Sequence, residues 1–153
     1  MAKLVINNHN EFEQYLGQVM GESEWHKINQ EQINRFADAT LDHQWIHINE
    51  ERAKEGPFGT TIAHGYLVLS LVPYLWEQIA QFNNVKMLVN YGMDKLKFGQ
   101  AVKVNDEIKL TATLKSLANL RGTSKAEVNA LLEIKEEKKP AFTATIIFLY
   151  HFG

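Results

Sequence analysis

The chain has no cysteine among its 153 residues. That absence excludes a disulfide framework, a thiol nucleophile and a thiolate metal site, and it is typical of a protein in a reducing compartment. The longest apolar run, residues 66–76, contains Pro73 and is well short of the ~20 residues that span a bilayer. The apolar stretch near the N-terminus ends after Ile6, so we expect no signal peptide, no membrane partner and a cytoplasmic location.

The sequence also lacks an excess of basic residues. Its net charge is −2, so we expect no nucleic-acid partner, because nucleic-acid phosphates are attracted by a basic surface. It has neither the glycine-rich fingerprint of dinucleotide binding nor a P-loop, and it has no G-x-S-x-G nucleophile elbow. These absences argue against phosphoryl-transfer enzymes and against enzymes that use a serine or cysteine nucleophile.

The composition is that of an ordinary folded protein, with 45% hydrophobic and 22% charged residues. A chain of this length can bury a sizeable core in one domain. We find no internal repeat, low-complexity linker or shift in composition that would divide it. We therefore expect a single domain over residues 1–153.

Helical patterns dominate the first half of the chain. Asn10 and Glu13 have the spacing of a capping box, which predicts a short helix that ends near Gly17. Residues 64–80 are apolar nearly all round, which indicates a buried helix, and Pro73 should kink it. The other elements expected here are an extended segment at residues 23–28, an amphipathic helix at 29–40, and a loop at 41–59 with one helical turn at 50–54.

The second half changes to a period of two residues, which is typical of half-buried strands. The segments that alternate are residues 108–114, 126–134 and 142–150, and residues 85–98 supply one or two further strands. Turn signals at residues 119–122 and 135–140 separate them, so we expect an antiparallel meander. One buried helix and a sheet long enough to curl round it make an α+β domain.

Titratable groups are crowded just ahead of the buried helix. Asp42 and His47 would form an acid/base pair if their side chains converged, and such a pair can hold one water molecule between its members. Five residues of regular helix rotate by ~140°, so the two converge only if the backbone leaves helical geometry between them. The alternative is that Asp42 caps a short helix beginning at His43, with His47 packed on its surface.

A metal site is a rival hypothesis for the same residues. His43 and His47 are four residues apart and would share one helix face, and Asp42 or His64 would complete the ligand set. The chain lacks the glutamate that the His-Glu-x-x-His zinc motif places beside its first histidine. We therefore predict no metal and no other cofactor.

Gly65 opens the predicted buried helix. A helix N-terminus presents unpaired N–H groups that suit an oxyanion or a polarised carbonyl, and glycine leaves room for that approach. The alternative is that Gly65 only allows the helix to pack closely against the sheet. Ser70 lies within the helix and would either face a pocket or bond back to the carbonyl of Tyr66.

These motifs together resemble the MaoC-like, (R)-specific enoyl-CoA hydratase (hydratase 2) family. The likeness rests on Asp42-x-x-x-x-His47 followed by Ala63-His64-Gly65, and the fuller runs at residues 39–47, 56–65 and 90–98 are similar to the nodulation protein N branch. The resemblance implies a hot-dog fold, in which an antiparallel sheet wraps one long buried helix, over the single domain 1–153. It implies that Asp42 and His47 handle the water, that the N–H of Gly65 polarises the thioester carbonyl, and that Ser70 contacts the substrate.

The resemblance also implies the partners and points to one departure. The substrate is an enoyl-CoA thioester, and no metal or redox cofactor is required. The edge strands of such a sheet are normally paired, so we expect a homodimer. Gln44 stands where the family usually has asparagine, and its amide is the expected substrate contact from a longer arm. Lys95 and Lys97 are candidate CoA contacts.

Two other functions fit the same resemblance. A hot-dog acyl-CoA thioesterase would direct the water at the thioester carbon. A non-catalytic acyl-thioester-binding accessory protein would bind acyl-CoA without turnover.

Overall fold

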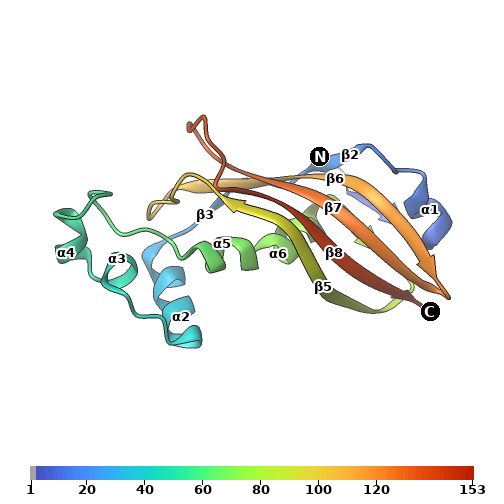
Figure 1. Cartoon of the computed structure of the whole chain (residues 1–153), viewed down its shortest axis with the longest axis horizontal. Helices are drawn as coiled ribbons and strands as arrows, with labels where there is room; N and C mark the ends of the chain where they lie inside the picture. Colours follow the sequence, from blue (N-terminus) through green and yellow to red (C-terminus); the bar gives the residue numbers. More distant parts are fainter. Residues whose placement is uncertain (1–2) are drawn as a thin grey trace.

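The computed structural model describes residues 3–153. A curved antiparallel sheet occupies one part of the molecule, and a group of short helices lies beyond one end of it (Figure 1). Two consecutive helices run along the concave side of the sheet and connect the two parts.

The main sheet is antiparallel and has the strand order β2-β6-β7-β8-β5. These strands are Val19–Glu22, Glu107–Leu120, Thr123–Ile134, Phe142–Phe152 and Val85–Phe98. A further short strand, β3 (His26–Lys27), pairs with β6. The meander predicted from the alternating pattern is confirmed, and residues 85–98 form one long strand at the end of the strand order.

A second, two-stranded sheet pairs β1 (Leu4–Ile6) with β4 (Ala80–Phe82) in parallel. It ties the N-terminus to the segment that follows the central helices. Residue 80, which was expected in the buried helix, therefore lies in a strand.

The buried helix is two helices in the structure, α5 (Gly65–Ser70) and α6 (Val72–Ile79), joined at Leu71. Pro73 lies in the first turn of α6, where a missing backbone N–H costs no helical hydrogen bond. Instead of a kink at Pro73, the helix is interrupted at Leu71, two residues before the proline. The apolar side chains of both helices enter the core under the sheet, namely Leu67, Val68, Val72, Leu75, Trp76 and Ile79.

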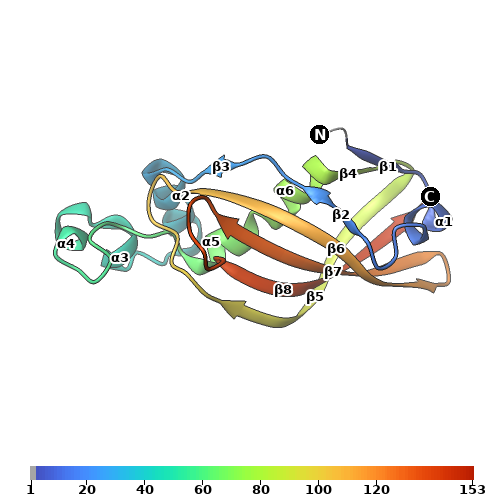
Figure 2. The same cartoon turned by 90° about the horizontal axis from the view of Figure 1, so that it is seen from above.

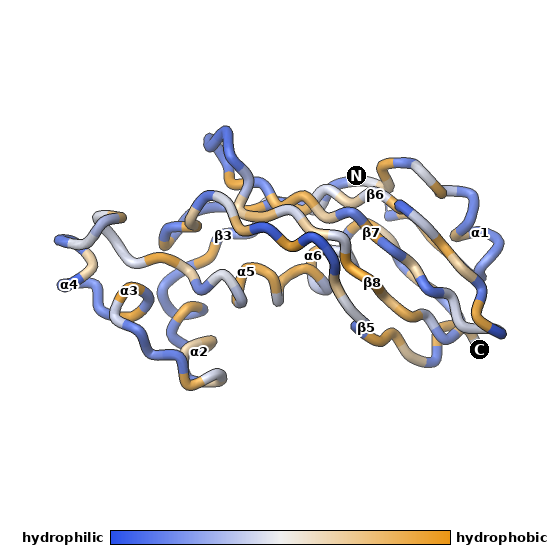
Figure 3. Tube along the Cα trace, in the orientation of Figure 1, coloured by the Kyte–Doolittle hydropathy of each residue, from blue (hydrophilic) through white to orange (hydrophobic). Residues whose placement is uncertain are grey.

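A sheet curled round a central helix is the hot-dog arrangement that was expected (Figure 2). Residues are buried at alternate positions along β7 and the first half of β6, whereas residues 144–148 of β8 are all buried. Figure 3 shows the apolar residues concentrated on the central helices and the strands, whereas α4 is hydrophilic. No helix within residues 3–153 is long and apolar enough to cross a membrane.

The N-terminal helices agree with the sequence prediction except for the start of α1 and the presence of α3. Helix α1 (His9–Glu13) is capped by Asn8, so the prediction of Asn10 as the cap is wrong by two residues. Helix α2 (Gln30–Thr40), capped by Asn29, and the turn of helix α4 (Glu50–Lys54) are confirmed. The extended segment 23–28 is only the short strand β3, and helix α3 (Trp45–Ile48) lies where a loop was expected and where the alternative placed a short helix beginning at His43.

Candidate active site

The backbone between Asp42 and His47 is not helical throughout. Helix α2 ends at Leu41, which has the left-handed φ of 67°, and α3 begins only at Trp45. This break brings Asp42, His47 and His64 together, with one ligand atom from each lying within 4.8 Å of the others. The alternative, in which Asp42 caps a helix starting at His43, is wrong: α3 starts two residues later, and its N-cap residue is Gln44.

His47 is buried, and its ring is held in one orientation. Its Nδ1 lies 2.8 Å from the carbonyl oxygen of Ile62, so Nδ1 carries the proton and donates it, and Nε2 keeps a free lone pair. Burial lowers the pKa of His47 below its usual value, and His64 adds to the lowering, while the Ile62 hydrogen bond and Asp42 oppose it. The ring is therefore a neutral acceptor at pH 7.

The backbone around His47 is also tied down. The carbonyl of His47 accepts a 2.8 Å hydrogen bond from the Gln30 side chain, whose own oxygen accepts a 2.5 Å bond from the hydroxyl of Thr61. The N–H of Ile62 donates to the carbonyl of Ile46 at 3.0 Å. Helix α3 is thus fixed to α2 on one side and to residues 61–62 on the other.

His64 stacks on His47, with ring centroids 3.8 Å apart and an angle of 20° between the planes. Its Nε2 lies 3.1 Å from the backbone carbonyl oxygen of Asp42 and donates to it. Its Nδ1 is buried and has no hydrogen-bond partner among residues 3–153. An unpaired buried acceptor costs about 1–3 kcal/mol, so this histidine is not a fully satisfied core residue.

Asp42, His47 and His64 are the residues that would hold a metal ion here. Two imidazoles on one tetrahedral ion have ring centroids about 5 Å apart, because the ion lies ~2.1 Å from each nitrogen and separates the rings. The observed 3.8 Å stack would have to open to share an ion. His43, a ligand in the rival metal hypothesis, is not in the cluster and instead pairs with Asp38 at 2.8 Å.

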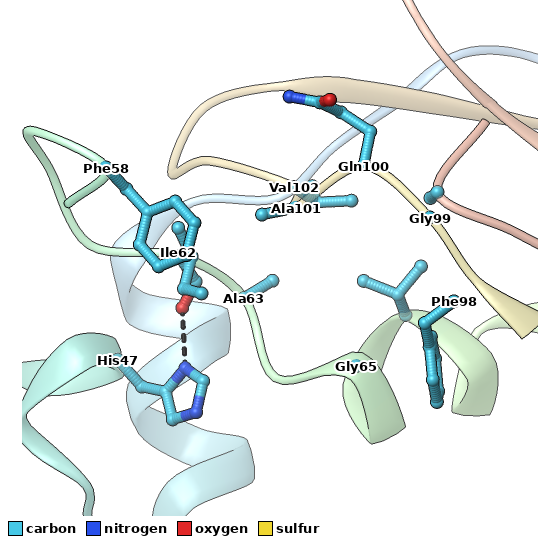
Figure 4. A pocket seen from close by; sticks show the side chains of 12 residues that line it. His47, Phe58, Ile62, Ala63, Gly65, Phe98, Gly99, Gln100, Ala101 and Val102 are labelled. Atoms are coloured by element: carbon cyan, nitrogen blue, oxygen red, sulfur yellow. Dashed lines mark hydrogen bonds between the residues drawn. The ribbon is translucent and has the colours of Figure 1, made fainter. Parts of the chain in front are cut away.

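A cavity of about 460 Å³ lies next to His47 (Figure 4). Its wall is mostly apolar, with His47 on one side and the polar side chain of Gln100 on the other. The full lining is His47, Phe58, Ile62, Ala63, Gly65, Val68, Phe98, Gly99, Gln100, Ala101, Val102 and Ala141. The site therefore combines a carboxylate and an imidazole with a largely apolar chamber.

Gly65 begins α5, as predicted, and lines this cavity. A Cβ atom added at Gly65 would lie 3.0 Å from the Phe98 ring, which comes from the end of β5. Close packing and approach of a substrate are thus both consistent with a glycine at this position.

None of the other four predicted contacts lines the cavity beside His47. The hydroxyl of Ser70 donates to the carbonyl of Tyr66 at 2.6 Å and borders a separate cavity beside Asn90 and Gly92. Lys95 and Lys97 are exposed on β5, and Lys95 borders a groove lined by outward-facing residues of the sheet. The exposed Gln44 precedes α3, close in sequence to Asp42 and His47, and its side chain makes no capping hydrogen bond.

Sequence reasoning missed the wall opposite His47, namely Phe58 and residues 98–102. Residues 99–100 are held there because their N–H groups donate to the carbonyls of Ala141 and Pro140 at 2.9 Å. A Cβ atom at Gly99 would lie 2.6 Å from the Pro140 carbonyl oxygen, so a residue without a side chain is required. In the sequence, only the position of Gly99 directly after the strand at residues 85–98 indicated that the backbone passes close to another segment here.

Comparisons with known proteins agree on one family. The model of the MaoC-like domain matches residues 11–136. The 3-hydroxyacyl-thioester dehydratase Z of Mycobacterium tuberculosis is 44% identical over 135 residues, covering 88% of this chain and 89% of the relative. Nodulation protein N of Rhizobium leguminosarum bv. viciae is 40% identical over 141 residues, covering 90% and 87%.

Solved structures share the fold. The (R)-hydratase from A. caviae involved in PHA biosynthesis superimposes with a TM-score of 0.70 at 20% identity, covering 86% of this chain and 95% of that one. The R-hydratase PhaJ1 from Pseudomonas aeruginosa also gives 0.70, at 17% identity and with coverage of 90% and 83%.

Proposed function

The chain belongs to the MaoC-like dehydratase family, and from that premise we propose that it is an (R)-specific enoyl-CoA hydratase. The reaction adds water to a trans-2-enoyl-CoA and gives the (R)-3-hydroxyacyl-CoA; as a hydro-lyase, the enzyme also catalyses the reverse dehydration. One observation carries the proposal: Asp42 is clustered with His47, whose Nε2 is free of hydrogen bonds, and His47 lines an apolar cavity whose wall includes Gly65.

The separation of Asp42 and His47 supports the proposal that they share one water molecule. Two acceptors that share a water at ordinary hydrogen-bond lengths lie about 4.5 Å apart, and the ligand atoms of Asp42 and His47 lie within 4.8 Å. In the proposed step the water oxygen bonds to C3 of the substrate while its proton passes to the pair. The electron pair of the double bond moves toward the thioester carbonyl, and a proton from the pair then completes the bond at C2, so the net change is addition of H₂O.

Negative charge develops on the thioester oxygen during this step, and a hydrogen-bond donor there stabilises it. Gly65 supports this role because it lies in the cavity wall and opens α5, where the first backbone N–H groups have no helical acceptor. Gln44 is the proposed amide contact to the substrate near the pair. Ser70 borders the neighbouring cavity of about 260 Å³, so its proposed contact is with a more distant part of the substrate.

The test uses crotonyl-CoA as the short-chain probe. We expect purified protein to remove the absorbance of the enoyl thioester, and Asp42→Asn or His47→Ala to lower that rate by about 10²–10⁴-fold, the range typical of a positioned acid/base group. His43→Gln is the matched control, because His43 is adjacent to Asp42 in sequence but pairs with Asp38 outside the cluster. An inactive wild-type protein across a series of acyl-chain lengths would refute the proposal.

A thioesterase is the second candidate, because the same water and the same Gly65 N–H would serve attack on the thioester carbon. A thiol reagent in the crotonyl-CoA reaction separates the two: hydration leaves CoA bound as thioester, whereas hydrolysis releases free thiol. An accessory protein would bind acyl-CoA without either change, and its affinity would survive Asp42→Asn.

We also propose that the enzyme is a cytoplasmic homodimer formed along β5. This strand ends the main sheet, and its far edge is unpaired within residues 3–153. Its large exposed apolar side chains are Met87, Leu88, Tyr91, Met93 and Phe98. A long, exposed apolar edge is unfavourable in a monomer. Light scattering with size-exclusion chromatography should give twice the chain mass of 17.5 kDa.

A further inference from the structure

His64 contacts all three parts of the proposed site. Its ring stacks on His47 at 3.8 Å, its Nε2 donates to the backbone carbonyl of Asp42 at 3.1 Å, and it is the residue directly before Gly65. Gln44 also bonds to both members of the pair, but through its backbone N–H and carbonyl, whereas His64 contacts them with its ring. The side chain is only 2% exposed, so it reaches the reaction through these neighbours and not through the cavity.

The position is not explained by core packing. An apolar side chain of similar volume would fill the space beside Phe36 without leaving Nδ1 buried and unpaired. What an apolar residue cannot do is donate to the carbonyl of Asp42. The hydrogen bond is therefore the property that distinguishes histidine from leucine at position 64.

The backbone that carries His64 is rigidly held. The N–H of Ala63 donates to the carbonyl of Val102 at 2.8 Å, and the carbonyl of Thr61 accepts from the N–H of Val104 at 3.0 Å. Ile62 in the same segment accepts from the ring of His47. Residues 61–64 are thus a fixed support between helix α3 and the segment that follows β5.

We propose that His64 is a positioning residue for the proposed hydration, one that holds Asp42 through its backbone carbonyl and His47 through the stacked ring so that both reach one water molecule. This inference rests on the proposed function for its kinetic readout. Because a displacement of about 1 Å in a reacting group can cost 10²-fold in rate, a residue that never touches substrate is able to control turnover.

Two variants separate positioning from packing. His64→Gln places an amide N–H near the position of Nε2 and so keeps the donor to Asp42, whereas His64→Leu fills the space without a donor. We expect kcat to fall about 10-fold in His64→Gln and about 100-fold in His64→Leu, with KM within about twofold of wild type in both, because only the reacting groups move. A pure packing role predicts the opposite order, since leucine buries no unpaired polar group.

The inference is overturned if His64→Leu is as active as His64→Gln, or if the loss lies in KM alone. His43→Gln is the matched control and should retain wild-type kcat, since His43 lies outside the cluster. Thermal unfolding of each variant shows that the comparison is made on folded protein.

A second readout needs no turnover. The ring ¹⁵N spectrum of His47 should show one fixed tautomer, with Nε2 unprotonated, in wild type. In His64→Leu and in His64→Gln the same signals should broaden or split, because both variants lack the ring that stacks on His47. Unchanged His47 signals in His64→Leu overturn the positioning role even if the wild type does not hydrate crotonyl-CoA, so failure of this inference and failure of the proposed function are distinguishable.

Discussion

The role of Gly65 can be decided by adding one methyl group. In Gly65→Ala the new Cβ would lie 3.0 Å from one edge carbon of the Phe98 ring, with the next two ring carbons at 3.2 and 3.4 Å. Ordinary carbon contacts lie at about 3.5–4.0 Å, so the ring must shift by several tenths of an ångström. Overpacking of this kind costs about 1–3 kcal/mol, and replacing glycine by alanine in an accessible backbone conformation returns about 0.4–1 kcal/mol.

The expected result is therefore a loss of about 1 kcal/mol in the free energy of unfolding, or about 2–4 °C in Tm. Phe98→Leu removes the ring and should abolish the penalty, so the two substitutions should couple in a double-mutant cycle. Additive effects on urea unfolding would refute the contact. Hydration of crotonyl-CoA by the double variant then separates the two explanations of the glycine: activity that stays low means that the methyl group blocks the thioester, and activity that returns means that Gly65 serves packing.

Four further predictions concern protonation, metal and the core. Burial lowers the pKa of His47 below 6.5, so the unfolded chain binds more protons than the folded protein as the pH falls through 6.5. The free energy of unfolding should therefore decline over this pH range, and the decline should be less steep in His47→Gln. The pH profile of kcat/KM should be flat near neutrality, with an acid limb whose midpoint lies below 6.5, and a midpoint above 6.5 would contradict a neutral imidazole in the free enzyme. Dialysis against a chelator should leave hydration unchanged, since the proposed step needs no metal; a loss that stoichiometric zinc restores would instead assign the Asp42 cluster to an ion. Tyr150→Phe should lower the free energy of unfolding by about 1–3 kcal/mol in chemical denaturation, because the buried indole N–H of Trp76 loses its acceptor. In the wild type the indole nitrogen lies 2.6 Å from the phenol oxygen. An unchanged denaturation midpoint would mean that another acceptor replaces it.

The strands and the long helices could be predicted because their patterns repeat. Alternation over many residues predicts a strand and its buried face. The apolar run at residues 64–79 predicts the buried side of the central helices, but not that Tyr66 and Tyr74 are 68% and 52% exposed. The residue at which a short helix begins is less well determined by the sequence. Asn8 with Glu11 and Asn10 with Glu13 have the same spacing, and the structure uses the first pair because the Glu11 carboxylate also accepts from the N–H of Asn7 at 2.7 Å.

The candidate site was predictable only along its continuous part. Asp42, His47 and Gly65 lie in one stretch of sequence whose residue types suggest chemistry, and the structure brings Asp42 and His47 into one cluster and Gly65 into the cavity wall beside His47. Whether those residues carry the proposed roles stays a prediction. Phe98 and Gln100 reach the same cavity from the far end of a strand, and the register between β5 and β8 that delivers them is a tertiary property.

The supporting contacts were also invisible in the sequence. The stack of His64 on His47 depends on the path of residues 61–64, which is fixed by backbone hydrogen bonds to Val102 and Val104. No spacing rule links positions 47 and 64, because the loop between them has no regular period.

The two walls of the cavity come from separate segments of the chain, and these segments have different proposed roles. The groups proposed to handle water come from residues 42–65, and the opposite wall comes largely from residues 98–102, which are anchored by their own contacts to residues 140–141. An exchange confined to Gln100 and Ala101 can thus reshape what enters the chamber, whereas Val102 must keep its place because its carbonyl accepts from the N–H of Ala63 in the first segment. The proposed chemistry and the choice of substrate would then depend largely on different residues, and substitution of Gln100 or Ala101 is the natural way to change one without rebuilding the other.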